Sequence, residues 1–369
     1  MGKSLKTKVL VISAVNFTEG GPLTILRDCL ASASHYLPSD WKIVALVHDK
    51  GLVNAARVKL ISVPNAKSSW IKRLYYEWVV FRKISKKLKP DLWFSLHDIT
   101  PRVISRRQVV YCHNPSPFYK LSLREAIFEP KFLIFNLFYK YLYGVFINRN
   151  HWVVVQQDWL RDAFKKLFGS LPIIVAYPSV NITKSSEVVA QSERPVIFFY
   201  PALPRVFKNF EVIGEAARVL AERGVSGFEI RITISPNENR YSKWLYSEYG
   251  RVPNLHFIGR QDRLGVSRNY QAASTLLFPS KLETWGLPIS EAKAYKKRIL
   301  VADLPYGKET VGNYQNVTFF EPTNAVMLAD LIQEITESKL QQLGNIASEP
   351  SEPFAANWAN LWPKMIEGL

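Results

Sequence analysis

Two glutamates, Glu283 and Glu291, lie eight residues apart in the stretch Leu276–Val301. The apolar runs at both ends of this stretch are typical of buried parallel strands, and Glu291 falls in the first turn of a predicted helix between them. Pro288 suits the first position of that helix. The free N–H groups of a helix start attract phosphate, and ligands bind at the carboxyl edge of a parallel sheet. The stretch is therefore a candidate site for a ligand that carries phosphate. The alternative is that both glutamates are solvated charges beside a helix start.

A second charged pair, Arg205 and Lys208, follows the predicted strand Val196–Tyr200 and precedes the predicted helix Phe210–Arg223. Arginine binds a diphosphate as a two-pronged donor, and lysine binds it as a point charge. The helix dipole disfavours cations near a helix start, so a bound anion explains the pair better than two surface charges do. The turn is therefore a candidate diphosphate site.

Two loops of the first half are further candidates. Gly20 and Gly21 follow the first predicted strand and open a helix, and paired glycines let a backbone approach a ligand closely. They do not form G-x-G-x-x-G, and by themselves they are explained by a tight turn. His113 comes directly after another predicted strand, at the sheet edge where ligands bind. His97 and Asp98 lie at a third strand end and are a second candidate for contact with an acceptor.

Apolar runs alternate with helical patterns along the whole chain, which predicts an α/β protein with parallel sheets. The segment Thr183–Arg194 is polar and without periodicity, so we place a linker at residues 183–193. The predicted strands are Val9–Ala14, Lys42–Val47, Val58–Val63, Asp91–Ser95, Gln108–Tyr111, Trp152–Gln156, Ile173–Tyr177, Val196–Tyr200, Glu229–Ile234, Leu255–Ile258, Thr275–Phe278, Arg298–Val301 and Val317–Phe320.

The spacing Glu283-x7-Glu291, with Gly286-Leu287-Pro288 inside it, resembles the signature of the retaining glycosyltransferases of the GT-B fold, in particular family 4 (glycosyl transferases group 1). The resemblance implies two Rossmann-like domains whose parallel sheets face each other across a cleft. The acceptor domain would be residues 1–182 and the nucleotide-sugar domain residues 194–350. The last helix, in residues 351–369, would pack back toward the first domain.

The resemblance also implies roles for individual residues. Glu291 would hold the ribose of a nucleotide-sugar, Glu283 would meet hydroxyl groups of the transferred sugar, and His113 would lie beside the reacting sugar and the acceptor. Trp285, Gly286 and Leu287 would contact the donor through their backbone, and Arg205 and Lys208 would bind its pyrophosphate. Gly259 and Arg260 would lie near the base. Gly20 and Gly21 would face the donor phosphates or the acceptor across the cleft.

The composition is that of a globular protein, with 47% hydrophobic and 21% charged residues, and two cysteines give neither a disulfide framework nor a zinc cluster. The net charge of +17 is uneven, since residues 1–190 contribute +16 and residues 191–369 contribute +1. A basic half suggests an anionic surface as a partner. Ser69–Lys89 is basic and aromatic and could lie on a membrane, whereas Lys120–Asn150 better fits a core or an acceptor groove.

We therefore expect a retaining glycosyltransferase. We expect it to be independent of metal, because no Asp-x-Asp occurs in the chain. It would use a UDP-, GDP- or dTDP-sugar as co-substrate, need no other cofactor, and extend a lipid-linked or growing glycan, as in O-antigen or capsule assembly. With no signal peptide or membrane span in the sequence, we expect a cytoplasmic protein, peripheral on the inner face of the membrane. Alternatives are a membrane-surface binding module with an inactive GT-B site and a GT-B nucleotide-sugar epimerase. Nucleic acid is not an expected partner, because no binding motif occurs.

Overall fold

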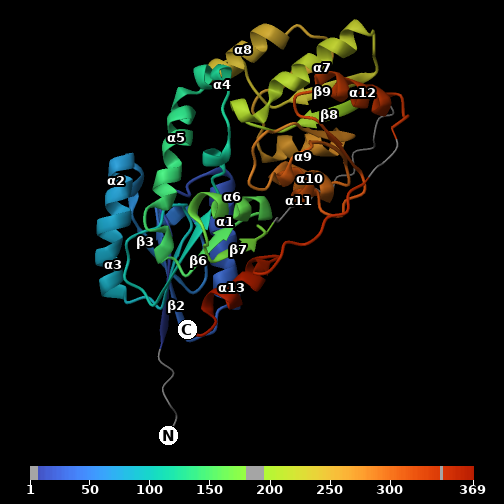
Figure 1. Ribbon diagram of the computed structural model, residues 1–369. Helices are drawn as coiled ribbons and strands as arrows, with labels where there is room; N and C mark the ends of the chain where they lie inside the picture. Colours follow the sequence, from blue (N-terminus) through green and yellow to red (C-terminus); the bar gives the residue numbers. More distant parts are fainter. Residues whose placement is uncertain (1–6, 180–194, 341–343) are drawn as a thin grey trace. The chain divides into compact units, whose positions relative to one another are not determined.

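The computed structural model describes residues 7–179, 195–340 and 344–369, and these fall into two α/β units (Figure 1). The first unit contains residues 7–118, 136–179 and 350–369, and the second contains the remaining described residues. The segment Tyr119–Phe135, which we predicted within the first domain, thus groups with the second unit. The predicted linker, residues 183–193, lies outside the described residues.

The first unit is built on an eight-stranded sheet with the order β14-β7-β6-β5-β4-β1-β2-β3, and every adjacent pair of strands is parallel. Buried residues run almost continuously through its central strands, as expected of a parallel sheet covered on both faces. The strands are β1 (Lys8–Ala14), β2 (Trp41–Val47), β3 (Val58–Ser62), β4 (Leu92–Ser95), β5 (Arg107–Cys112), β6 (Trp152–Val155), β7 (Ile173–Ala176) and β14 (Phe354–Ala355).

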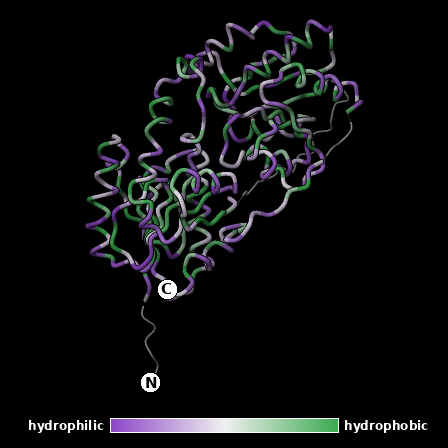
Figure 2. The backbone as a smooth tube through the Cα atoms, viewed as in Figure 1, coloured by the Kyte–Doolittle hydropathy of each residue, from purple (hydrophilic) through white to green (hydrophobic). Residues whose placement is uncertain are grey.

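Helices cover both faces of this sheet. Leu30 of α1 (Gly20–Tyr36) and Trp362 of α13 (Trp358–Ile366) share one buried cluster with Leu10 and Phe94. Phe81 of α3 (Phe81–Leu88) packs on the other face, where Trp93 lies. Before α3 come α2 (Trp70–Tyr75) and a π-helical turn (Tyr76–Val80), while α6 (Asp158–Phe168) packs beside β6 and β7. Hydrophilic and hydrophobic residues alternate along α2 and α3 (Figure 2), as expected of helices with one buried face.

The second unit is built on a six-stranded parallel sheet with the order β10-β9-β8-β11-β12-β13. Helix α7 packs against α12 and α8, and α10 packs against α11, β11 and β12. The strands are β8 (Val196–Tyr200), β9 (Phe228–Ile232), β10 (Leu255–Phe257), β11 (Thr275–Phe278), β12 (Arg298–Ala302) and β13 (Val317–Phe320). The helices are α4 (Leu123–Phe128), α7 (Phe210–Glu222), α8 (Arg240–Tyr249), α9 (Arg263–Ala272), α10 (Leu287–Ala294), α11 (Pro305–Val311) and α12 (Ala325–Thr336). Helix α5 (Pro130–Gly144) gives residues 130–135 to this unit and 136–144 to the first.

Each sheet has one point where the chain order of its strands reverses. In the first sheet it lies between β1 and β4, and in the second between β8 and β11. The loops that leave the carboxyl ends of such a strand pair diverge to opposite faces and leave a crevice, where α/β proteins bind ligands. These two reversal points therefore define where a site is expected in each unit.

The predicted α/β class with two parallel sheets is confirmed, and all thirteen predicted strands are present with ends shifted by at most two residues. Strand β14 was missed, because residues 352–369 read as one helix. The two-residue strand pairs with β7 before α13 begins. The predicted cleft between the sheets remains a prediction.

Candidate active site

The two charged loops predicted in the second unit meet at its reversal point. The Nζ of Lys208, after β8, donates a hydrogen bond to the Oε1 of Glu283, after β11. Both side chains are largely buried, at 17% and 14% exposure. The loops are also joined through their backbones, because the N–H of Lys281 donates to the carbonyl of Phe207 (2.7 Å) and the Asn209 side chain donates to the carbonyl of Pro279 (3.1 Å). The geometry therefore brings Lys208 and Glu283 together in one rigid corner.

Two buried tyrosines line this corner. Burial and the negative charge of Glu283 raise the pKa of Tyr200 and of Tyr306 well above the usual tyrosine value. Both phenols therefore stay protonated and act as donors: Tyr200 to the carbonyl of Lys208 (2.9 Å) and Tyr306 to the carbonyl of Ser280 (2.5 Å). They fix the backbones that carry Lys208 and Glu283.

The turn from Glu283 into α10 requires the glycine at Gly286. Its φ is +78°, a left-handed conformation, and a Cβ there would lie 3.1 Å from the ring of Phe278. Trp285 is nearly buried and donates from Nε1 to the Oγ of Ser290 (3.0 Å), while its carbonyl accepts from the hydroxyl of Thr310. The N–H of Ile289 returns to the carbonyl of Gly286 (2.9 Å). The predicted sugar-supporting backbone from Trp285 to Leu287 is thus held by specific contacts.

Glu291 was predicted in the first turn of its helix, but α10 already begins at Leu287, so Glu291 lies on the second turn. It faces α9. Burial raises the pKa of its carboxyl, and this effect is opposed by a hydrogen bond from Tyr270 and by the charge of Arg263. The Tyr270 ring stacks on Tyr295 at 5.3 Å, so its position is set by packing. A carboxylate in this setting has oxygens left to accept from the hydroxyls of a ligand.

Arg205, which we predicted to bind a pyrophosphate, instead binds a carboxylate of the protein. Its Nε donates to Glu129 (2.7 Å), and the N–H of Val206 donates to the other oxygen of the same carboxylate (2.8 Å). The guanidinium also lies 5.3 Å from the ring centres of Phe132 and Phe207. The predicted binding of a pyrophosphate by Arg205 remains a prediction, and its contact with Glu129 was not predicted from the sequence.

Gly259 and Arg260 lie after β10, the edge strand of the sheet. Gly259 has a φ of +71°, and a Cβ there would lie 3.1 Å from the Oγ of Ser235. Arg260 is exposed, and Gln261 folds back to donate to the carbonyls of Ile258 (2.8 Å) and Gly259 (3.2 Å). Their predicted role near a nucleotide base remains a prediction.

In the first unit, the loops after β1, β4 and β5 converge on His113. Its ring packs edge-on against Phe17 (5.1 Å) from the loop after β1 and stacks over Tyr111 (6.1 Å). Its Nδ1 lies 3.4 Å from the carboxylate of Asp98, which follows β4. Gly20, with a φ of +61° and no atom within 4 Å of a Cβ placed there, and Gly21 begin α1 just after Phe17. The predicted candidates of this unit thus gather at its reversal point, and their roles remain predictions.

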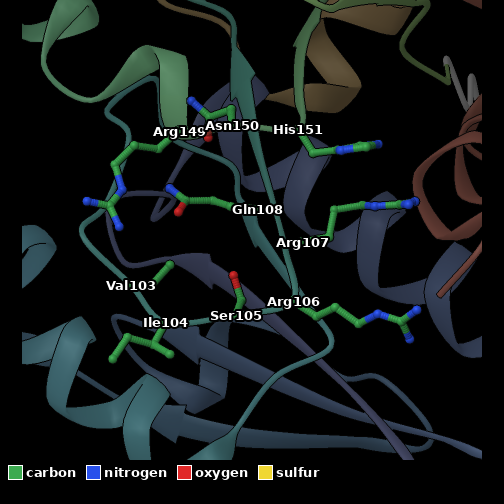
Figure 3. A pocket seen from close by; sticks show the side chains of 9 residues that line it. All are labelled: Val103, Ile104, Ser105, Arg106, Arg107, Gln108, Arg149, Asn150 and His151. Atoms are coloured by element: carbon green, nitrogen blue, oxygen red, sulfur yellow. The ribbon is translucent and has the colours of Figure 1, made fainter.

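A hollow of about 490 Å³ lies at the opposite edge of the same sheet (Figure 3). Arg106, Arg107 and His151 extend to one side of the backbone, and Arg149 extends to the other. Two of these arginines already bond the end of α13, since Arg106 donates to the carbonyl of Gly368 (2.9 Å) and Arg107 to that of Met365 (2.8 Å). The hollow lies at the amino ends of β5 and β6, so it is not the candidate site.

Comparisons with known proteins find relatives of the second unit and of the whole fold. The family model of glycosyl transferases group 1 matches residues 181–349. O-antigen chain mannosyltransferase RfbU of Salmonella typhimurium is 22% identical over 271 residues, covering 69% of this chain and 70% of that protein. Sucrose-phosphate synthase from Thermosynechococcus elongatus has a similar structure, with a TM-score of 0.64, 15% identity and 90% of each chain covered. Anabaena HepE, solved with UDP-glucose, gives a TM-score of 0.59 and 15% identity, covering 89% of this chain and 90% of its own.

The family match covers Arg205, Lys208, Glu283 and Glu291, so the corner described above lies in the matched part of the chain. The structural similarities cover about nine-tenths of the chain and establish the fold of both units. The chain therefore has the GT-B fold of these solved glycosyltransferases, and its residues 181–349 match the family of glycosyl transferases group 1.

Proposed function

We propose that this glycosyltransferase is a metal-independent retaining enzyme of family 4 that moves a sugar from a nucleotide-sugar to a lipid-linked or growing polysaccharide. The proposal rests mainly on one observation. Lys208 pairs with Glu283 at the reversal point of the second unit, within the residues that match the family model. The O-antigen mannosyltransferase supports the acceptor class, and the UDP-glucose complex of HepE supports a nucleotide-sugar donor. The absence of Asp-x-Asp from the sequence supports metal independence.

The chemistry assigned to this corner is stabilisation of a leaving diphosphate. Breaking the bond between the sugar and the phosphate develops negative charge on the leaving oxygen. Lys208 is largely shielded from solvent, and the electrostatic interaction of its charge with a phosphate is stronger there than in bulk water. Glu283 orients it and is then free to accept a hydroxyl of the sugar, while Glu291 accepts the hydroxyls of the ribose. Because these groups are held before the donor binds, little reorganisation is needed during reaction.

A helical surface of the first unit supports a membrane as a partner. Ile71, Tyr75 and Val79 are exposed by 82%, 51% and 38%, at the spacing of one helical face. That face continues into the exposed Lys83 and Lys87 of α3. Apolar side chains followed by lysines fit the boundary between acyl chains and anionic headgroups. Among the described residues, no helix is both long and apolar enough to cross a bilayer. We propose that this surface holds the enzyme on the cytoplasmic face of a membrane that carries its acceptor.

Turnover with a panel of UDP-, GDP- and dTDP-sugars tests this function. We expect nucleotide release to rise when a lipid-linked glycan is added, to persist in EDTA and to be abolished by Glu291→Ala. The anomeric configuration of the product, read by NMR, decides whether transfer is retaining. An EDTA-sensitive reaction or an inverted product would contradict the corresponding part of the proposal.

The same exposed helical face favours a second candidate, a membrane-surface binding module with an inactive site. Binding to anionic vesicles without nucleotide release from any donor would support it. Turnover that requires Glu291 would exclude it.

A further inference from the structure

We infer that Asp98 is a positioning residue that holds the His113 imidazole with Nδ1 protonated and Nε2 free for the acceptor. The catalytic relevance of this arrangement rests on the proposed function, in which His113 lies beside the reacting sugar. The geometry itself is a property of the first unit alone, because Asp98, His113 and all their partners named below belong to it.

The carboxylate of Asp98 organises the loop that carries His113. Its Oδ1 accepts from the backbone N–H of His113 (2.8 Å) and of Asn114 (3.1 Å). Two phenols complete the set, since Tyr143 donates to Oδ1 (3.0 Å) and Tyr139 to Oδ2 (3.2 Å). Four donors on one buried carboxylate leave it little freedom to rotate.

The backbone of Asp98 is fixed as well. Its N–H donates to the carbonyl of Tyr111 (3.0 Å), which ties the loop after β4 to the strand that leads into His113. Its φ is +66°, a left-handed conformation that side chains other than glycine, asparagine and aspartate seldom adopt. A non-glycine residue keeps this unfavourable conformation only when the contacts around it hold it there, and such residues concentrate at functional sites.

The imidazole of His113 is oriented toward Asp98. Its Nδ1 is buried and lies 3.4 Å from Oδ1 of Asp98, and no hydrogen-bond donor or acceptor pairs with that nitrogen among the described residues. The ring is held between Phe17 and Tyr111, while the side chain as a whole keeps 17% exposure. Of the two ring nitrogens, Nδ1 is therefore the one whose N–H can donate to the carboxylate. The other nitrogen, Nε2, is then the one left to accept a proton from a hydroxyl.

Four further titratable groups lie around this pair: Tyr139, Tyr143, Cys112 and His97. Burial and the charge of Asp98 raise the pKa of Tyr139 and of Tyr143 well above 10, so both remain donors. The thiol of Cys112 likewise has a raised pKa and stays protonated. His97, which interacts electrostatically with His113, has a pKa lowered by burial and by the charge of Arg73 and therefore stays neutral. None of these neighbours brings a competing negative charge to Nδ1.

The test uses the full-length enzyme, with Asp98→Asn and Asp98→Ala beside His113→Ala and the double variant Asp98→Asn/His113→Ala. Asp91→Asn is the matched control, because Asp91 also accepts a backbone N–H (Val9, 2.9 Å) but lies at the other end of β4. We expect Asp98→Asn to lower kcat about a hundredfold, with the donor KM changed by less than about twofold. The double variant should be no slower than His113→Ala, because Asp98 acts through His113. A further large loss in the double variant would overturn the inference.

A readout that does not need turnover is the tautomer of His113, seen in the ring ¹⁵N shifts of the enzyme. The chain has 6 histidines, and the His113 signals are identified by their loss in His113→Ala. We expect a proton on Nδ1 in the wild type and in Asp91→Asn, and loss of that preference in both Asp98 variants. A proton on Nε2 in the wild type overturns the inference even if the enzyme is active. The Nδ1 tautomer in a protein that turns over no donor keeps the inference and counts against the proposed function.

Discussion

The guanidinium of Arg205 and the carboxylate of Glu129 form a charge-assisted pair at 2.7 Å, reinforced by the N–H of Val206. The two residues are 76 positions apart in the chain, and both belong to the second unit. A carboxylate with one oxygen on each donor presents the same pattern of acceptors as a phosphate. Glu129 thus occupies the guanidinium that we predicted to bind a diphosphate.

Replacing Glu129 by glutamine should strengthen donor binding. The Arg205 side chain is 41% exposed, and an exposed pair is worth about 1 kcal/mol or less, so we expect the donor Kd to fall about two- to fivefold. Calorimetric titration with the active nucleotide-sugar measures this. Glu248→Gln removes a more exposed carboxylate partner of another arginine, Arg218, and is the control. Weaker binding in Glu129→Gln would mean that Glu129 orients Arg205 for the donor.

Lys208→Met and Glu283→Gln should each lower kcat about a hundred- to a thousandfold, the cost of removing one preorganised group at a developing charge. Each should also destabilise the enzyme by about 1–3 kcal/mol, because the remaining partner is buried without its pair. Urea unfolding and nucleotide release measure the two effects. The double variant should regain stability without regaining activity.

The exposed pair Arg223 and Asp330 provides the control for that experiment, since its atoms are 2.7 Å apart but its side chains are 36% and 49% exposed. Removing either partner should leave activity and stability nearly unchanged. Recovery of turnover in the Lys208→Met/Glu283→Gln double variant would show that the pair serves folding alone.

The buried carboxyl of Glu77 should make stability depend on pH. Burial raises its pKa from 4.5 to about 7, against the opposing charge of Arg73, whose Nε bonds it at 2.8 Å. A carboxyl whose pKa is raised by folding contributes stability below its unfolded pKa and loses that contribution as pH rises through the folded value. The cost of Glu77→Gln should therefore be largest below pH 4.5 and shrink toward pH 7. Urea unfolding of both proteins at several pH values measures the difference, and a cost that grows with pH would contradict it.

Reversing two lysines of α3, with Lys83→Glu and Lys87→Glu, should weaken binding to anionic vesicles. Each lysine near such a surface contributes about 1 kcal/mol, so the double variant should bind at least tenfold more weakly, and the difference should fade as salt rises. Vesicle sedimentation measures this. Lys243→Glu with Arg251→Glu changes the same charge on exposed positions of the second unit and should have little effect. Equal losses in both variants would indicate attraction by net charge alone.

The strands were predictable because a parallel sheet buried on both faces leaves continuous apolar runs, as in Val196–Tyr200. The proximity of Lys208 and Glu283 was also predictable, since each follows a strand whose carboxyl end lies at the reversal point. Strand β14 could not be read, because two residues after a proline carry no periodic signal.

The partner of Arg205 was beyond sequence reasoning for a different reason. Glu129 reaches Arg205 because Phe132 packs on Phe207 (5.4 Å) and Phe128 packs on Tyr241 (5.6 Å), which place Tyr119–Phe135 on the second unit. Local propensity and spacing do not encode such long-range contacts. The aromatic residues of Lys120–Asn150 likewise divide into buried ones, such as Phe132, Tyr139 and Tyr143, and exposed ones, such as Phe138 and Tyr141, which only packing decides.

The insertion of β14 and α13 into the first unit sets an order of events during synthesis. Trp358 and Trp362 lie in the same buried cluster as Leu10 and Phe94, although they leave the ribosome after the whole second unit. The first unit cannot close its apolar interior until these residues emerge, by which time the second unit has been fully translated. An amino-terminal fragment ending at residue 179 would leave the face of its sheet beneath α13 open to water, and such a surface promotes aggregation.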